Sequence, residues 1–332
     1  MTEYFVDLGS KNITIYKKDA GLILKEPSIV VISNHKKRVT LVASGSKAQS
    51  LIGNTTIDQQ IVYPIKCGAI YHPKGAVLLL KSLIDKSLKQ NYFTKSKFEV
   101  IVGISCGLTL TERKQVEEVF IATGASKITL IESVCAVNQS IGGSNCIIDF
   151  GGEKTEVAIV TPKGIIAGCT VDICGDSINQ LIMDYLADKY RVMVQYFTTE
   201  RLKKVVANLL KDDLTTVTVN GRGLVDKEPK SVKLTAREIK EAILPAIDKI
   251  CGVVEKVLFM IPENLGEEIY RKGIYVCGGA GKLVGLADYL QAKLLMKINL
   301  IEDIDNCCCI GGASYFYNKE LLNEMLNISF KR

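Results

Sequence analysis

The chain has 332 residues, enough for two domains of ordinary size or one bilobal unit. Its 42 basic and 36 acidic residues give a net charge of +6 that is spread along the sequence, so we expect no nucleic-acid partner. Eleven cysteines without a C-x-x-C pair, and only two histidines, argue against a zinc site and fit a reducing cytosol. We see no secretory signal and no apolar run of about 18 residues, so the predicted location is cytoplasmic.

Two similar β-hairpins are predicted, close to half a chain apart. Residues 6–16 read VDLGSKNITIY, and residues 148–160 read IDFGGEKTEVAIV. In each, an apolar strand ends in Asp-x-Gly, a short polar turn follows, and a second alternating strand begins. The matching order indicates an internal duplication that places Asp7 and Asp149 at equivalent positions.

A second pair of segments supports the duplication. The sequence from residue 99, EVIVGISCGLTLTERKQVEEVF, predicts a strand, a glycine-containing turn and an amphipathic helix. The sequence from residue 273, GIYVCGGAGKLVGLADYL, repeats that order. The pattern therefore predicts a duplicated α/β fold with two lobes related by a pseudo-twofold axis.

Two stretches break this pattern, and we interpret them as smaller subdomains inserted in the two repeats. Residues 31 to about 63 read as short strands and turns. The second stretch, to about residue 243, starts with an amphipathic helix, DSINQLIMDYLADKYRV, continues with a helix at TTERLKKVVANLL and ends in the β-rich TTVTVNGRGL. Near the C-terminus, the run Cys307–Cys309 is interpreted as three small apolar residues packed before a Gly-Gly turn, with a redox-active run as the weaker alternative.

The two hairpins suggest a site that binds a polyphosphate together with a metal ion. Glycines at a turn let backbone N–H groups approach an anion closely, so two such turns are suited to a polyphosphate. Asp7 and Asp149, just before the turns, can hold a magnesium ion through its waters. A later loop, Gly278–Gly281, opens a helix and lets a ligand approach the backbone. Each feature alone is more often an ordinary turn, whereas the matched set is specific.

The order of these motifs resembles the actin-like ATPase superfamily and, within it, the bacterial MreB family. The segments that carry the resemblance run nearly end to end and include LKEPSIVVI, ISCGLTLTERKQV, TGASKITLIES, CGDSINQLI and GIYVCGGAGKLVGL. The resemblance implies a duplicated actin-like (RNase H-like) α/β fold with a nucleotide cleft between two lobes. It also implies four subdomains: IA at 1–30, 64–144 and 311–332; IB at 31–63; IIA at 145–180 and 244–310; IIB at 181–243.

The resemblance further implies roles for individual residues toward ATP or ADP. It assigns the first phosphate loop to Gly9, Ser10, Lys11 and Asn12, the second to Gly151, Gly152, Glu153, Lys154 and Thr155, the adenosine-contacting helix to Glu200, Lys203 and Lys204, and the adenine-side loop to Gly278, Gly279 and Ala280. Without it, we would interpret Glu200 and Lys203 as a solvated (i, i+3) pair.

The sequence departs from the family pattern at the expected catalytic centre. Similar proteins read Asp-x-Gly-Gly-Gly-Thr-Thr-Glu where this chain has Glu153 and Lys154. We expect Glu153 to point outward or pair with Lys154, and Lys154 or Lys11 to neutralise a phosphate oxygen. Ser133 stands where the family carries its water-orienting glutamate, and losing a general base removes about 10²–10⁴-fold in rate. Ser133, Lys154 and Thr155 thus predict a weakened site and slow hydrolysis.

The implied function is a cytoskeletal filament that binds ATP with Mg²⁺ and serves cell shape or an internal cytoskeleton. The implied partners are copies of the chain in paired protofilaments, other MreB paralogues, and the inner face of the membrane through Tyr92 and Phe93, which lie among lysines. A solvated turn explains that aromatic pair equally well. Two alternatives stay open: a nucleotide-free scaffold co-assembling with an active homologue, and a small-molecule kinase of the same fold.

Overall fold

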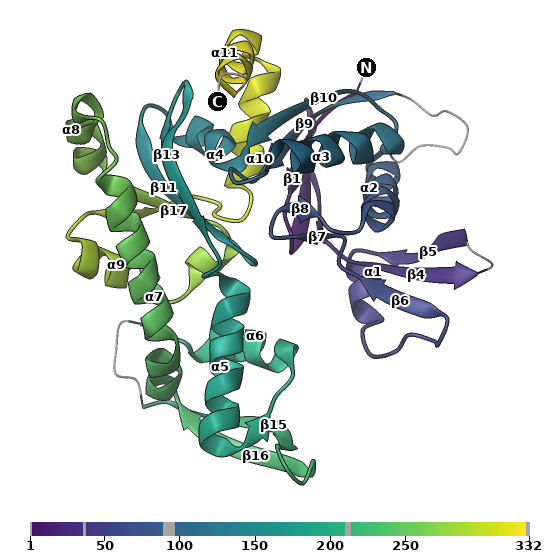
Figure 1. The fold of residues 1–332 in the computed structure, drawn as a ribbon, viewed down its shortest axis with the longest axis vertical. Helices are drawn as coiled ribbons and strands as arrows, with labels where there is room; N and C mark the ends of the chain where they lie inside the picture. The colour runs from purple at the N-terminus through teal and green to yellow at the C-terminus, as the bar shows by residue number, and fades with distance from the viewer. Residues whose placement is uncertain (1, 36–37, 89–96, 210–213, 330–332) are drawn as a thin grey trace. The chain divides into compact units, whose positions relative to one another are not determined.

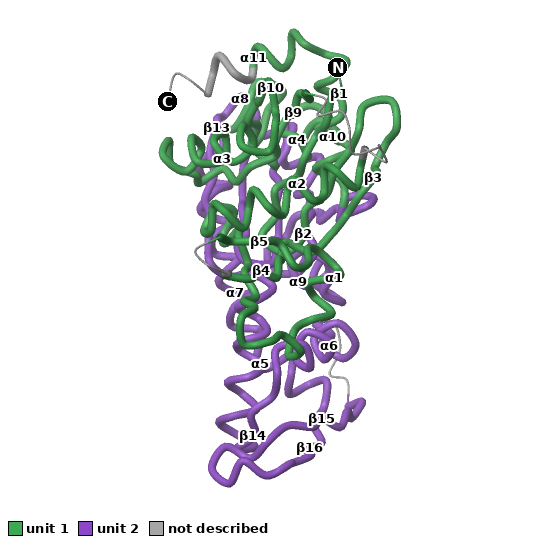
Figure 2. The backbone as a smooth tube through the Cα atoms, turned by 90° about the vertical axis from the view of Figure 1, so that its right-hand side faces the viewer, with its two compact units in different colours: residues 1–143, 160–165, 306–332 green, residues 144–159, 166–305 purple. Residues whose placement is uncertain are grey.

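The computed structural model describes residues 2–35, 38–88, 97–209 and 214–329 (Figure 1). The chain divides into two compact units, coloured green and purple in Figure 2. Unit 1 comprises residues 1–143, 160–165 and 306–332, and unit 2 comprises residues 144–159 and 166–305. Within the described part of the chain, no helix is both long and apolar enough to cross a membrane.

Unit 1 is built on a five-stranded mixed sheet in the order β10-β9-β1-β2-β3. The first three strands form an antiparallel meander, and β9 and β10 are added parallel to β1. Consecutive apolar residues on β1 and β9 bury both strands, as expected for the centre of a covered sheet. The strands are β1 (Thr2–Leu8), β2 (Asn12–Lys17), β3 (Gly21–Pro27), β9 (Phe98–Ile104) and β10 (Ala125–Glu132).

The rest of unit 1 consists of helices and small sheets. A three-stranded sheet, β5-β4-β6, and a short hairpin, β7-β8, lie between β3 and the first long helix in sequence. The elements are β4 (Val30–His35), β5 (Arg38–Ser44), α1 (Ser46–Ser50), β6 (Gln59–Val62), β7 (Ile65–Lys66), β8 (Ala69–Ile70), α2 (Pro73–Leu88), α3 (Leu110–Thr123), α4 (Ser133–Ile141), α10 (Cys307–Gly312), η2 (Ala313–Phe316) and α11 (Lys319–Ser329).

Unit 2 repeats the sheet of unit 1. Its order is β13-β12-β11-β17-β18, so three consecutive strands are again followed by two later strands on the side of the first. The later strands β17 and β18 are parallel to β11, as β9 and β10 are to β1. This equivalence confirms the duplicated α/β fold predicted from the repeated segments. The strands are β11 (Asn145–Phe150), β12 (Thr155–Thr161), β13 (Gly164–Val171), β17 (Ile274–Cys277) and β18 (Ile298–Leu300).

The remaining elements of unit 2 surround a large apolar core. The predicted amphipathic helix is α5, and its periodic residues Ile178, Ile182 and Leu186 are buried in that core. The long helix α7 has a buried stripe that packs into the same core. The elements are α5 (Gly175–Tyr190), β14 (Val192–Met193), α6 (Tyr196–Val206), β15 (Thr216–Gly223), β16 (Pro229–Thr235), α7 (Ala236–Leu258), α8 (Glu263–Lys272), η1 (Gly279–Lys282) and α9 (Leu286–Leu294).

The cysteine run corrects one local expectation. Cys307, Cys308 and Cys309 are buried, as small apolar residues would be, but they begin helix α10 rather than precede a turn. The following glycines stay helical because α10 packs closely on its neighbours. A Cβ on Gly311 would lie 2.0 Å from the Ala136 carbonyl oxygen, and one on Gly312 would lie 2.1 Å from the Phe5 ring. The two glycines therefore permit close packing instead of a chain reversal.

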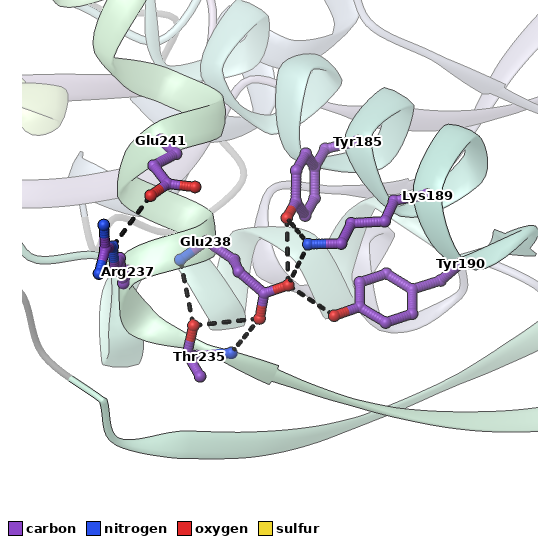
Figure 3. A network of polar contacts seen from close by, with 7 residues as sticks. All are labelled: Tyr185, Lys189, Tyr190, Thr235, Arg237, Glu238 and Glu241. Atoms are coloured by element: carbon purple, nitrogen blue, oxygen red, sulfur yellow. Dashed lines mark hydrogen bonds and ion pairs between the residues drawn. The ribbon is translucent and has the colours of Figure 1, made fainter.

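A polar network joins the C-terminal end of α5 to the first turn of α7 (Figure 3). Lys189 Nζ and the Tyr190 hydroxyl each donate to Glu238 Oε1 at 2.6 Å, and the Tyr185 hydroxyl donates to the same atom at 3.1 Å. The other carboxylate oxygen, Oε2, accepts from the backbone N–H and the hydroxyl of Thr235 and completes a capping box. One carboxylate thus caps α7 and ties it to α5.

Candidate functional site

The first hairpin is held in shape by contacts from two later segments of unit 1. The Ser28 hydroxyl donates to the Gly9 carbonyl oxygen at 2.6 Å, and its backbone N–H donates to Lys11 O at 2.9 Å. The Ser10 hydroxyl accepts from the Gly68 N–H at 2.9 Å. A Cβ on Gly9 would lie 2.5 Å from the Asn12 carbonyl oxygen, so the turn excludes any side chain there. The predicted loop from Gly9 to Asn12 is therefore a tight turn fixed by these contacts.

Ser133 begins helix α4 beside this hairpin, in a crowded part of unit 1. Measured from a Cβ placed on Gly103, Cys308 Sγ lies 3.1 Å away and Ser133 Oγ lies 3.3 Å away. Burial and the Asp7 carboxylate raise the pKa of the Cys308 thiol well above its usual value, while a hydrogen bond with Ser133 lowers it. The Ser133 hydroxyl is thus engaged with a neutral thiol. The preceding Glu132 forms a 2.8 Å ion pair with Arg113 on α3.

The second hairpin has the same kind of closed turn in unit 2. The Gly151 N–H donates to Lys154 O at 3.0 Å, and a Cβ on Gly151 would lie 2.8 Å from that oxygen. Asp149 is the second-last residue of strand β11 and is half-buried. Gly278 lies against it: with φ of 82°, a Cβ there would be 2.4 Å from Asp149 Oδ1. The predicted adenine-side loop and the second phosphate hairpin are therefore in contact.

The loop after Gly278 continues as the 3-10 helix η1, which contains Gly279 and Ala280. Its position is fixed by a hydrogen bond from the Gly278 N–H to Ile304 O at 3.3 Å and by an ion pair between Lys282 and Asp305. The tight turn demands glycine at 278, because this backbone conformation is one that other residues rarely adopt. Three glycines of unit 2, at 151, 152 and 278, thus form a cradle of small residues.

The charged residues at the second hairpin make contacts that sequence reasoning missed. Lys154 Nζ lies 2.9 Å from Oε1 of Glu156, a buried acid two residues along β12. The pair lacks hydrogen-bond alignment, and Nζ has no hydrogen-bond partner among the described residues. Thr155 faces the other side of the strand, is fully buried, and donates to Ile173 O at 2.5 Å. The spacing of two between residues 154 and 156, which puts side chains on one side of an extended segment, was the available signal.

The predicted adenosine-side residues of α6 form an ion-paired cluster. Glu200 pairs with Lys203 at 2.8 Å and with Lys204 at 3.0 Å, and it accepts from Asn179 Nδ2 at 2.7 Å. Burial alone would raise the pKa of Glu200, but the Lys203 and Asn179 donors outweigh it and lower the pKa to about 2. Lys203 is itself buried and donates to Gly175 O at 2.9 Å. The alternative of a merely solvated pair is wrong for Lys203.

The predicted residues thus fall into two groups, one in each unit. Unit 1 holds Asp7, Gly9, Ser10, Lys11, Asn12 and Ser133, and unit 2 holds Asp149, Gly151, Gly152, Glu153, Lys154, Thr155, Glu200, Lys203, Lys204, Gly278, Gly279 and Ala280. Within unit 2, the hairpin, α6 and η1 meet at the first turn of α5. Gly175 and Asp176 make these contacts, and the sequence predicted no site role for either residue. Tyr92 and Phe93 lie outside the described residues.

Comparison with solved structures defines the class of protein. The fold matches MreB5 of Spiroplasma citri bound to ADP with a TM-score of 0.87 and 26% sequence identity, over 98% of each chain. The same protein bound to AMPPNP matches with a TM-score of 0.86. The MamK double helical filament shares the fold at 14% identity, with a TM-score of 0.78 over 95% of this chain and 99% of that chain. The fold is that of a bacterial actin homologue.

Sequence comparison gives the family. The family model for MreB/Mbl protein matches residues 2–324. The chain is 25% identical to the cell shape-determining protein Mbl of Bacillus subtilis over 96% of each sequence, and 28% identical to the cell shape-determining protein MreB of Escherichia coli K12 over 93% of this chain and 91% of that protein. The chain belongs to the MreB/Mbl family, and the resemblance inferred from its motifs is confirmed.

Proposed function

We propose that this chain binds ATP with Mg²⁺, assembles into cytoskeletal filaments and hydrolyses the nucleotide slowly. The main support for this proposal is the pair of equivalent Asp-x-Gly hairpins. Each hairpin turn is so tight that its glycine position has no room for a side chain. Turns of this kind present backbone N–H groups to phosphate. The likeness to MreB5, solved with ADP and with AMPPNP, supports a nucleotide as the ligand.

The residues present fit this ligand. A Cβ at Gly9, Gly151 or Gly278 would meet neighbouring protein atoms at 2.4–2.8 Å, so each position requires glycine and carries no side chain between backbone and ligand. Asp7 and Asp149, each at the end of a strand before its turn, would hold Mg²⁺ through water, since magnesium binds few carboxylates and keeps several waters. The ion would neutralise phosphate charge. Glu200, Lys203 and Lys204 would hold the nucleoside end.

Slow hydrolysis follows from the residues at the expected catalytic position. The Ser133 hydroxyl is engaged with Cys308, and a serine has little base strength near neutral pH. Glu132, the nearest acid in sequence, is already paired with Arg113 at 2.8 Å. With Lys154 and Thr155 also turned to protein partners, the site favours binding over turnover.

Light scattering with and without nucleotide tests filament assembly. Adding ATP and Mg²⁺ to the full chain should raise the scattering and the pelleted fraction, and both should fall in an Asp149→Ala chain. Assembly that is equal with and without nucleotide would favour the nucleotide-free scaffold instead. A phosphate-release assay then compares the wild type with Ser133→Glu; equal, fast release from both would contradict the weakened site.

The same proposal includes partners and location. The proposed partners are copies of this chain in paired protofilaments and paralogues, and the proposed location is the cytoplasm at the inner face of the membrane. Membership of the MreB/Mbl family supports these proposals. The aromatic pair Tyr92 and Phe93 carries the membrane contact, because aromatic side chains flanked by lysines suit an anionic lipid surface.

A further inference from the structure

The first turn of helix α5 is the junction of three segments of the proposed site. A methyl group placed on Gly175 would lie 3.5 Å from Gly152 Cα, 3.5 Å from Lys203 Nζ and 3.6 Å from Ala280 Cβ. These atoms belong to the phosphate hairpin, to the nucleoside-side helix α6 and to the η1 loop. All are ordinary van der Waals separations, so this one turn packs directly against each segment.

Hydrogen bonds from this turn fix the direction of the hairpin's peptide groups. The Gly175 N–H donates to Gly151 O at 3.0 Å, and the Asp176 N–H donates to Gly152 O at 2.8 Å. In a trans peptide the C=O and the following N–H point in opposite directions. Because both carbonyls point toward α5, the N–H groups of Gly152 and Glu153 point away from it. The first turn of α5 therefore sets the direction of two backbone N–H groups of the phosphate hairpin, those of Gly152 and Glu153.

The same turn is anchored from the other side by α6. The Tyr196 hydroxyl donates to Asp176 Oδ1 at 2.6 Å, and Lys203 Nζ donates to Gly175 O at 2.9 Å. The pKa of the Tyr196 phenol is raised by burial and by its bond to Asp176, so it remains a donor at neutral pH. A continuous chain of contacts thus runs from α6 through Asp176 to Gly152.

We infer that Asp176 and Tyr196 are positioning residues that orient the second phosphate hairpin for the terminal phosphates of the nucleotide. This rests on the proposed nucleotide binding. Tyr196 acts through Asp176 on the hairpin, although it lies on the helix assigned to the nucleoside. The hydroxyl of Tyr196 therefore contributes to the affinity for phosphate groups rather than to that for the adenosine moiety.

The test is the ratio of the dissociation constants for AMP and ATP, each measured by calorimetry with Mg²⁺ on the full chain. This ratio isolates the contribution of the β- and γ-phosphates. Tyr196→Phe removes only the hydroxyl and should lower the ratio about 10-fold, the scale of one lost hydrogen bond. Asp176→Ala should lower the ratio by the same amount. Asp176→Asn should keep most of the wild-type ratio, because the amide oxygen still accepts the hydrogen bond. Tyr196→Phe combined with Asp176→Ala should lower the ratio no more than either single substitution.

Tyr190→Phe is the matched control, because it also removes a phenol that donates to a carboxylate in unit 2, but far from the hairpin along α5. Its ratio should equal the wild-type value. If Tyr196→Phe weakens AMP and ATP equally, or lowers only the melting temperature, the positioning role is overturned while nucleotide binding stands. If the folded wild type binds neither nucleotide, the proposed function fails and this inference fails with it.

Discussion

Lys154 Nζ, just before β12, lies 2.9 Å from Oε1 of Glu156, the second residue of that strand. The carboxylate is the more buried partner, with 4% of its side chain exposed against 17% for the lysine. The cation just before β12 is therefore matched to a buried anion within that strand.

Removing the lysine should destabilise unit 2, because the buried Glu156 would lose its ion pair with Lys154. We expect Lys154→Met to lower the free energy of unfolding by about 2–3 kcal/mol. Urea denaturation measures the loss, and Glu156→Gln is the matched partner variant. In the double variant Lys154→Met with Glu156→Gln, most of the loss should return, since no charge remains unpaired. Fully additive losses would show that the pair does not interact.

A methyl group at Gly278 should disturb Asp149 directly. The backbone conformation there, with φ of 82°, is strained for any other residue, and the added Cβ would lie 2.4 Å from Asp149 Oδ1. We expect Gly278→Ala to cost about 2–5 kcal/mol of stability and to weaken binding of ATP with Mg²⁺. Gly252→Ala is the control, because the glycine lies in α7 with nothing within 4 Å, and alanine there should stabilise by about 0.5–1 kcal/mol. Equal stability of the two variants would contradict the close packing.

The Glu238 network predicts a pH dependence of stability. Burial raises the pKa of Glu238, but the Lys189, Tyr190 and Thr235 donors outweigh it and lower the pKa to about 2. A folded-state pKa below the unfolded value of about 4.3 gives stability that is present above that value and is lost as pH falls toward 2. By linkage this contribution is up to about 3 kcal/mol at pH 7.

Urea midpoints between pH 7 and pH 3 measure this contribution. The wild type should exceed Glu238→Gln clearly at pH 7, and the difference should shrink as the pH falls to 3. Glu241→Gln is the control on the same helix, since its pair with Arg237 is exposed on both sides (Figure 3). A difference between wild type and Glu238→Gln that does not change with pH would contradict the lowered pKa.

The aromatic pair at residues 92 and 93 gives a prediction about membranes. The full chain should pellet with vesicles that contain anionic lipid, and Tyr92→Ser with Phe93→Ser should abolish the pelleting. Neutral vesicles provide the control, because the flanking lysines attract only anionic surfaces. Pelleting that is unchanged in the double variant would remove the membrane contact.

The fold was predictable from the sequence because its hairpins and helices have recognisable local residue patterns. An apolar strand that ends in Asp-x-Gly, followed by an alternating strand, marks both hairpins, and helical spacing marks α5, so the duplication could be inferred before any contact was known. The contacts within the candidate site could not be predicted from the sequence in the same way. The ion pair of Lys154 with Glu156 depends on where β12 begins. The hydrogen bonds from Gly175 and Asp176 to the hairpin join segments about 25 residues apart, and no sequence periodicity encodes that pairing. The helical Gly311–Gly312 pair reflects tertiary packing against β1 and α4, which outweighs the usual tendency of two glycines to turn.

Calorimetric titration of ATP with Mg²⁺ into the full, folded chain tests the central claim most directly. The account predicts saturable binding of one nucleotide per chain, weakened at least about 10-fold by Asp149→Ala and by Asp7→Ala, one from each hairpin. Binding that survives both substitutions unchanged, or no heat from a chain whose fold is intact, would contradict a site built on these two hairpins.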